Sequence, residues 1–171
     1  MNSRITILCS VLAVLLVTGC PKKNSVAKTS QLKAEKFAGH ECAACGMIVR
    51  DQSSPRGQVV HRDGTRKYFC SVADMMTYLL APSPHGKTKA VFVETLDPKV
   101  DPTIFSKPQR PWRDSEKSTY VLGVDKPRVM GKPILVYETT KQAKAVAEKY
   151  KGKVVGWSGL QATFKKPATK K

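Results

Sequence analysis

The sequence lacks the short motifs that mark several common enzyme sites. It contains no glycine-rich phosphate-binding loop, no Gly-x-Ser-x-Gly nucleophile elbow and no His-Glu-x-x-His helix of a zinc protease. Phosphoryl transfer, acyl transfer at an activated serine and metal-dependent proteolysis are therefore not indicated. A carrier that binds its cargo without turning it over fits the chain better.

The chain also lacks an apolar run long enough to span a bilayer comfortably. Its main run, 5–17, is about 13 residues long, whereas a permanent membrane helix needs about 20. Arg4 precedes this run and Val-Thr-Gly-Cys20 ends it, which predicts a signal peptide over 1–19 and a bacterial lipobox. We expect Cys20 to be lipidated and to begin a flexible tether over 20–39. A retained signal anchor is the alternative.

Acidic residues are few, with 13 Asp and Glu against 30 Lys and Arg, and the net charge is +17. Cleavage removes Arg4 and no acid, which leaves +16. Such an excess of positive charge is typical of proteins that bind nucleic acid, an acidic partner or an anionic membrane surface. Secretion argues against nucleic acid, and many lysines lie in the tether and in a basic tail over 165–171. Simple solubility and docking to an acidic partner or lipid headgroups both stay open.

Few cysteines are left in the mature chain. Cys9 leaves with the signal peptide and Cys20 carries the lipid, so Cys42, Cys45 and Cys70 remain. Three thiols cannot all pair within one chain. At least one of them therefore stays free, binds a ligand or pairs with another molecule.

The most informative stretch is Cys42-Ala43-Ala44-Cys45-Gly46-Met47, with two thiols and a thioether in six residues. Soft sulfur ligands outside the cytoplasm favour Cu(I). We expect Cys45 as a thiolate ligand, Met47 as a nearby thioether and Met130 as a ligand from a second part of the fold, with Cys42 as a further candidate. A Cys42–Cys45 disulfide and ordinary core packing of the two methionines are the alternatives.

Histidines and the third cysteine allow two other interpretations. His40 and His61 would complete a zinc site with Cys42 and Cys45, but the second ligand pair of a zinc ribbon is missing. We expect His61 to be a half-exposed strand residue. Cys70 precedes a predicted helix, whose amides lower a thiol pKa, so an activated thiol and a buried inert one are both open.

The apolar periodicity predicts an α+β fold with two homologous strand-strand-helix-strand units. The first, about 40–97, has strands predicted over 47–50, 58–62, 65–69 and 89–95 and a helix capped by Ser71. The second, about 112–160, has strands over 118–122, 133–137 and 154–155 and a helix over 140–151 capped by Gly152. Neither unit is large enough alone, so we expect one compact domain over 40–164. The proline-rich connection 98–111 either crosses between the units or covers a site.

These segments together resemble NosL-type copper chaperone lipoproteins. The residues that carry the resemblance are Cys45-Gly46-Met47-Ile48-Val49, Tyr68-Phe69, Asp74 to Leu79, Trp112-Arg113-Asp114, Met130-Gly131-Lys132-Pro133, Ala143 to Tyr150 and Gly152 to Trp157. It covers about 41–160. Two departures are Arg128-Val129, where the family tends to have Thr-Pro, and Phe69-Cys70-Ser71, which replaces a more acidic stretch.

The resemblance implies a lipid-anchored protein on the periplasmic face of a bacterial membrane, with the outer membrane slightly favoured by Pro21. It also implies delivery of Cu(I) for metal-centre assembly of nitrous oxide reductase. An ABC-type assembly complex is the implied docking partner, and the copper site is expected where the two units meet.

Two thiol enzymes are the rival interpretations. A thiol-disulfide oxidoreductase shares the Cys-x-x-Cys spacing, but its motif opens a helix, whereas Ile48-Val49 are expected to continue as a strand. An organomercurial lyase is related to the family in fold, and Phe69-Cys70 before a helix is similar to one of its cysteine segments. Its full set of paired cysteines and aspartate is not matched in the sequence.

Overall fold

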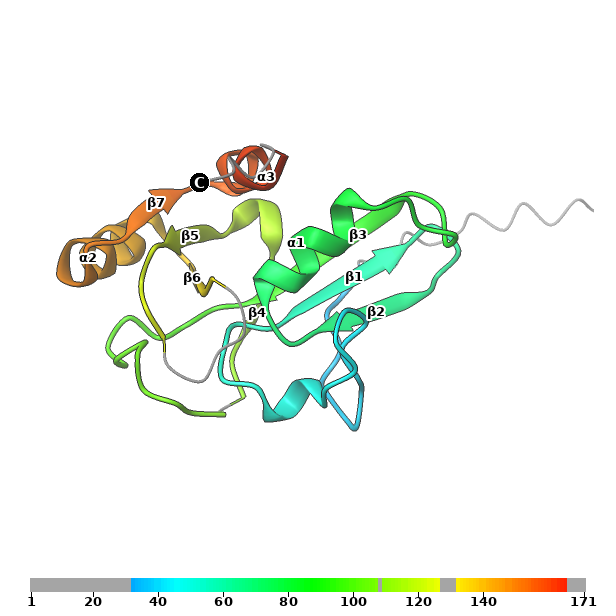
Figure 1. Ribbon diagram of the computed structural model, residues 1–171, viewed down its shortest axis with the longest axis horizontal. Helices are drawn as coiled ribbons and strands as arrows, with labels where there is room; N and C mark the ends of the chain where they lie inside the picture. Colours follow the sequence, from blue (N-terminus) through cyan, green and yellow to red (C-terminus); the bar gives the residue numbers. More distant parts are fainter. Residues whose placement is uncertain (1–31, 108, 127–131, 166–171) are drawn as a thin grey trace, which may run out of the picture. The chain divides into compact units, whose positions relative to one another are not determined.

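The computed structural model describes residues 32–107, 109–126 and 132–165 (Figure 1). Its first elements are η1 (Val49–Asp51), β1 (Gly57–His61), β2 (Arg66–Phe69), α1 (Val72–Leu80), β3 (Thr88–Glu94) and β4 (Trp112–Asp114). They are followed by η2 (Ser115–Lys117), β5 (Thr119–Leu122), β6 (Ile134–Tyr137), α2 (Thr140–Tyr150), β7 (Lys153–Val155) and α3 (Trp157–Lys165). No helix in these described ranges combines the length and the apolar composition needed to cross a bilayer.

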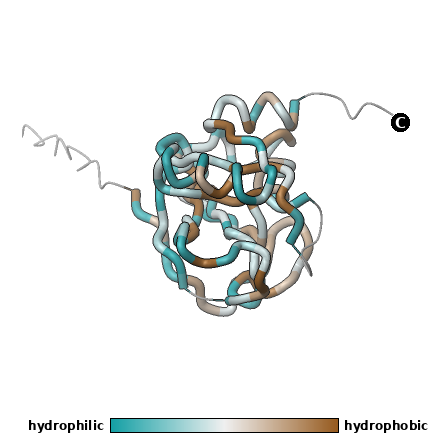
Figure 2. Tube along the Cα trace, turned by 90° about the vertical axis from the view of Figure 1, so that its left-hand side faces the viewer, coloured by the Kyte–Doolittle hydropathy of each residue, from teal (hydrophilic) through white to brown (hydrophobic). Residues whose placement is uncertain are grey.

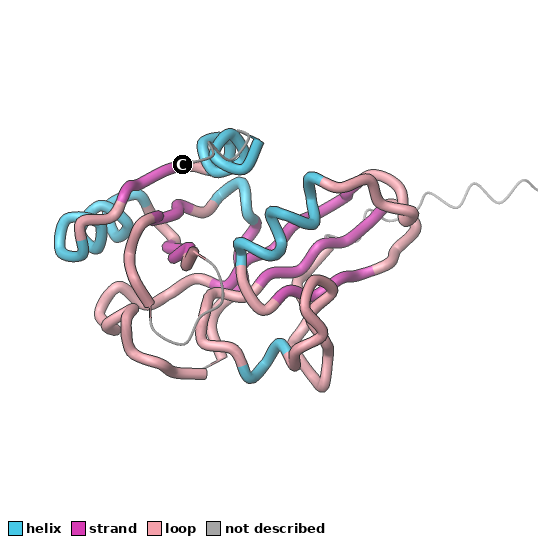
Figure 3. Tube along the Cα trace, in the orientation of Figure 1, coloured by secondary structure: helices cyan, strands magenta, loops and turns pink. Residues whose placement is uncertain are grey.

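The strands form two antiparallel sheets with the same internal order. In the first sheet, β1 lies between β2 and β3, and β4 extends the other side of β3. In the second sheet, β5 lies between β6 and β7. One helix joins the second and third strand of each unit, as the alternation of strands and helices along the chain shows (Figure 3). The predicted α+β fold and its strand-strand-helix-strand repeat are confirmed.

The predicted strand over 47–50 is wrong. Gly46 has φ of +74°, a conformation that favours glycine, and it turns the chain back on itself. Ile48 then makes a single bridge with Glu41, and the next three residues wind into the 3₁₀ turn η1. A single bridge is too short to count as a strand. The first two strands of the unit are therefore β1 and β2.

The helix starts follow the sequence, but one helix end does not. Ser71 caps α1 by accepting from the backbone N–H of Asp74, and Thr139 with Gln142 forms a capping box at α2. The left-handed residue that ends α2 is Lys151, with φ of 56°, and not Gly152. Gly152 is needed for space instead, because a Cβ there would lie 2.5 Å from Val121 Cγ1.

The two units share one core. Alternate residues of β5 and β6 point to opposite faces of the second sheet. Tyr120, Ile134 and Val136 pack with first-unit residues such as Phe69 and Met75, whereas the other face packs against α2. Hydrophobic and hydrophilic stretches accordingly alternate along the chain trace (Figure 2). The first of these two core clusters is therefore built by both units, whereas the second lies mainly within the second unit.

The connection between β3 and β4 contacts both units. Leu96 N–H donates to Val136 O of β6 at 2.8 Å, and Ser106 N–H donates to Ser53 Oγ at 3.1 Å. The connection does not lead directly to the second sheet, because β4 pairs back onto β3. The sequence prediction included neither β4 nor the terminal helix α3, whose Leu160 is buried in the shared core.

Candidate metal centre

Three thiols and one carboxylate converge in the first unit. The sulfur atoms of Cys42, Cys45 and Cys70 and a carboxylate oxygen of Asp74 all lie within 4.8 Å of one another. They come from two segments, the turn before η1 and the junction between β2 and α1. The sequence prediction paired Cys42 with Cys45 and left Cys70 open, and the fold brings all three together.

The turn that carries Cys42 and Cys45 is held by backbone hydrogen bonds. Cys42 N–H donates to Met47 O at 2.8 Å, and Gly46 N–H donates to Cys42 O at 2.9 Å. Ala43 N–H donates to Tyr68 O of β2 at 2.8 Å, which fastens the turn to the first sheet. The Cys-x-x-Cys pair therefore lies in a tight turn and does not open a helix, in contrast to the motif of a thioredoxin-like enzyme.

The second segment is the capped start of α1. Cys70 and Asp74 are four residues apart and face each other across the first helical turn. Asp74 Oδ2 accepts from the Cys70 thiol at 3.1 Å and from the Ser71 hydroxyl at 2.8 Å. The sequence prediction did not include Asp74 among the candidate ligands. The signal that was missed is the Cys-Ser-x-x-Asp spacing, which puts a thiol and a carboxylate on one side of a helix start.

The thiols contact one another directly. Cys45 Sγ lies 3.5 Å from Cys70 Sγ, and Cys70 N–H donates to Cys42 Sγ at 3.4 Å. All three are free cysteines in the structure, so the Cys42–Cys45 disulfide alternative is not formed. Cys42 is 3% exposed and Cys70 is 5% exposed, whereas Cys45 is only half-buried. Cys45 is therefore the thiol that solvent or another molecule reaches first.

The three thiols differ in acidity. Interaction with the Cys70 side chain, helped by the backbone amides of Cys70, Ala44 and Cys45, lowers the pKa of Cys42 to about 5 despite its burial. Interaction with Cys42, burial and Asp74 raise the pKa of Cys70, and burial raises that of Cys45. At neutral pH the site holds one thiolate and two thiols. Of the two interpretations left open for Cys70, the structure favours the buried thiol, and Cys42 is the acidic one.

Of the two expected methionine ligands, the structure describes Met47. Met47 is half-buried and packs against the shared core, and its backbone N–H hydrogen-bonds the Cys45 sulfur. Met130 lies outside the described residues, as does Cys20. Met75 and Met76 of α1 are buried in the core.

The structure does not assemble the zinc site with two histidines. His61 is 2% exposed and not half-exposed, and its ring nitrogens contact Tyr78 Oη at 2.8 Å and Gly86 O at 3.2 Å. The His40 ring stacks on Tyr68 at 3.9 Å. Neither histidine belongs to the four-residue group that the described part of the chain forms.

This donor set suits a soft metal ion. Thiolates bind closed-shell Cu(I) well at two or three coordination, and no rigid geometry is needed. The carboxylate of Asp74 is a hard donor that already accepts from the Cys70 thiol, so it orients that sulfur. The site can therefore offer three sulfur ligands on one side of the first sheet.

Comparison with known proteins gives a consistent result. A profile of the family described as NosL matches residues 33–164. The chain is 32% identical over 168 residues to a protein of Stutzerimonas stutzeri named copper-binding lipoprotein NosL, with 94% of this chain and 84% of the relative covered. The crystal structure of the copper chaperone NosL from Shewanella denitrificans matches with a TM-score of 0.63 and 27% identity, over 74% of this chain and 93% of that one.

Proposed function

This chain belongs to the NosL family. We propose that it is a lipid-anchored protein that binds Cu(I) and transfers it to an acceptor. The observation that carries the proposal is the group of three free thiols within 4.8 Å. The names of the two relatives, a copper-binding lipoprotein and a copper chaperone, support copper as the cargo.

The arrangement of the thiols suits transfer as well as binding. Cys42 is a ready thiolate, and copper displaces the protons of Cys45 and Cys70 as it binds. Because Cys45 is the most accessible sulfur, an acceptor ligand reaches the metal on its side. Exchange then proceeds with the buried thiols still holding the ion, so that free copper is not released. Met47 and Met130 are proposed as additional thioether ligands.

Location and acceptor follow from the family resemblance. We infer that Cys20 anchors the chain to the periplasmic face of a bacterial membrane and that copper goes to the metal centres of nitrous oxide reductase, with an ABC-type complex as partner. Mixing copper-loaded protein with metal-free nitrous oxide reductase and following the enzyme's copper absorption bands tests the delivery step. No change in these bands would contradict it.

An anaerobic titration tests the binding site. The reduced chain 21–171 competes for Cu(I) with a chromogenic chelator, and one tightly bound copper per chain is expected. Cys45→Ser and Cys70→Ser should each lower the affinity about tenfold or more, because a hydroxyl is a poor ligand for a soft ion. Met47→Leu tests the thioether at nearly constant volume.

The matched control is His85→Ala, which removes a potential copper ligand that lies outside the four-residue group. It should leave the affinity unchanged. Thiol variants that bind copper as tightly as the parent would exclude this site, and an equal loss in the control would show that copper binds non-specifically.

One observation also favours an organomercurial lyase as a second candidate. Cys45, Cys70 and Asp74 bring together two thiols and a carboxylate, which the sequence had not matched. Incubation of the reduced protein with an alkylmercury compound, followed by gas chromatography of the released alkane, separates the two functions. A carrier releases no more alkane than a control reaction without the protein. Release of more than one alkane per protein molecule would establish the enzyme.

A further inference from the structure

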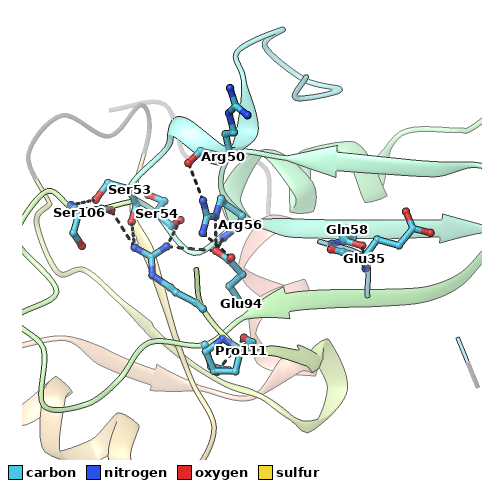
Figure 4. Close-up of polar contacts among 11 residues, drawn as sticks. Glu35, Arg50, Ser53, Ser54, Arg56, Gln58, Glu94, Ser106 and Pro111 are labelled. Carbon is cyan, nitrogen blue, oxygen red and sulfur yellow. Dashed lines mark hydrogen bonds and ion pairs between the residues drawn. The ribbon is translucent and has the colours of Figure 1, made fainter. Parts of the chain in front are cut away.

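A strongly cationic hollow of about 540 Å³ lies away from the thiol group, beside the connection between β3 and β4. Five basic and two acidic residues line it together with aromatic and polar ones. The charged residues are Lys36, Arg50, Asp51, Arg56, Glu94, Lys107 and Arg110. Part of this region is drawn in Figure 4.

Two buried guanidinium groups share one carboxylate at the bottom of this hollow. Arg56 bonds both oxygens of Glu94, at 2.5 and 2.7 Å, and Arg110 Nη1 lies 3.4 Å from Glu94 Oε2 (Figure 4). Arg110 also donates to the backbone oxygens of Ser53 and Ser54. Burial lowers the pKa of Arg110, although Glu94 opposes this shift. The bottom of the hollow therefore carries more positive charge than its carboxylate balances.

The outer side chains add to this charge. Lys36, Arg50 and Lys107 are exposed, and Lys107 Nζ lies 3.7 Å from Asp51 Oδ1 with both groups about half exposed. Such an exposed pair contributes little binding energy, so Lys107 can turn to a stronger anion. Basic groups at the entrance and at the bottom thus favour an anionic ligand.

An apolar hollow of about 310 Å³ adjoins the cationic one. The two share Gln109, Arg110 and Pro111, and Val100 and Ile104 contribute to the apolar side. Asp97 and Asp101 also line it, and Arg110 and Lys126 balance their charge. Because Arg110 belongs to both hollows, their charges are counted together, and the six basic and four acidic residues leave a net positive charge.

The same connection exposes large apolar side chains. Val100 is 52% exposed, Ile104 59% and Phe105 38%, and Lys107 Nζ lies 5.9 Å from the centre of the Phe105 ring. Exposed apolar residues next to basic ones are the composition of a membrane-interface segment, in which basic side chains reach the headgroups.

The first described residues run along the first sheet toward this face, from Lys33, whose carbonyl accepts from Arg66 of β2. Lys36 lines the cationic hollow, and the neighbouring Glu35 is fixed by two hydrogen bonds to Gln58, at 3.0 and 2.6 Å (Figure 4). If Cys20 carries the lipid, the residues up to Leu32 allow a reach of about 40 Å when fully extended. Such an anchor keeps the domain near a bilayer, and the choice of this face rests on its charge and its exposed apolar residues.

We propose that this face docks on an anionic phospholipid membrane, with a lipid phosphate in the cationic hollow and Val100, Ile104 and Phe105 in the headgroup layer. The proposal rests on the membrane-anchored location but not on copper binding. The thiol group takes no part in it, so a failed vesicle experiment leaves the copper proposal standing, and the reverse also holds.

Sedimentation with vesicles tests the docking. The chain 21–171, which retains the shared core and lacks the lipid, is mixed with vesicles of phosphatidylcholine alone or with added phosphatidylglycerol. Binding is expected only to the anionic vesicles and should fall as salt rises. Arg50→Gln with Lys107→Gln should weaken it about 30-fold, since each basic residue near an anionic surface contributes roughly a fivefold factor.

The matched control is Lys141→Gln with Lys144→Gln, which removes the same charge from exposed positions of α2. It should change binding less than threefold. Ile104→Ser with Phe105→Ser should abolish the part of the binding that resists salt, whereas Leu80→Ser, at another exposed apolar residue, should not. Circular dichroism and the copper titration confirm that each variant is folded.

Three results would overturn the proposal. No binding to anionic vesicles excludes it, and equal losses in the test and control pairs show only non-specific attraction of a basic protein. Binding to polyglutamate through Arg50 and Lys107, with none to vesicles, would replace the membrane with an acidic polypeptide.

Discussion

Among single residues, the thiol that is most acidic is also one of the most buried. Desolvation alone would raise the pKa of Cys42, and the interaction with the Cys70 side chain outweighs it. Cys42 is therefore the sulfur that is already deprotonated for metal binding, whereas Cys45 is the sulfur that solvent or another molecule can reach. The division of roles follows from which sulfur receives hydrogen bonds and which is near solvent.

A pH titration of the metal-free protein tests this assignment. Thiolate absorbance from one cysteine should persist as pH falls from about 9, the ordinary thiol pKa, and should disappear near 5. Cys70→Ala removes this side chain, so the pKa of Cys42 should rise toward its ordinary value. In Cys45→Ala the backbone amide of residue 45 remains, and the pKa of Cys42 should stay low. A Cys42 that titrates near 9 in the parent would refute the assignment.

For single residues, the sequence identified Cys42 and Cys45 as candidate ligands, but it did not show which other side chains lie beside them. Soft ligands close together in sequence were recognisable, but Cys70 and Asp74 join Cys42 and Cys45 only because Ala43 is bonded to the end of β2. His61 alternates with apolar residues, and a two-residue period does not reveal that Tyr78 and Gly86 satisfy a buried imidazole.

Among the helices and strands, the end of α2 requires a glycine for steric reasons. Gly152 leaves room for neighbouring side chains, and Lys151 is the residue with the left-handed backbone conformation. Gly152→Ala should destabilise the fold by about 1–3 kcal/mol, because the new methyl group meets Val121 and Val124. Urea denaturation measures this loss. Gly39→Ala, with no atom within 4 Å of the added carbon, should stay within about 0.5 kcal/mol of the parent.

Long periodic elements were the predictable part of the fold. The patterns of α2, β5 and β6 gave their positions to within one or two residues, since each buries one face in a core. Segments 47–50 and 112–114 were not predicted correctly, for two different reasons. Residues 112–114 become β4 by pairing with β3, and the turn at Gly46 prevents a strand at 47–50.

For the described domain as a whole, the shared core predicts a single unfolding transition. Trp112 lies in β4 of the first sheet and Trp157 begins α3, close to Tyr120 of the second. Trp157→Phe and Trp112→Phe each leave one fluorescent reporter. In each variant, fluorescence and far-UV circular dichroism should give the same urea midpoint. Two separated midpoints would show that the units unfold independently.

Buried charge also stabilises the whole domain. Glu94 forms ion pairs with both Arg56 and Arg110, and Arg110 joins the segment around Ser53 to the connection between β3 and β4. Glu94→Gln removes the buried carboxylate that both guanidinium groups bond and should cost about 3–5 kcal/mol in thermal or urea unfolding. Glu138→Gln breaks the exposed pair with Arg113 and should cost less than about 1 kcal/mol. Equal costs would refute this role of Glu94.

The thiols come from two separate segments of the chain. Cys42 and Cys45 lie on a turn that backbone hydrogen bonds fasten to β2, whereas Cys70 lies at the junction between β2 and α1. Cys42 and Cys70 are both buried in the core. An ion held by all three sulfur atoms would therefore cross-link the turn to the start of α1, and it could leave only after its bonds to one of the two segments had broken.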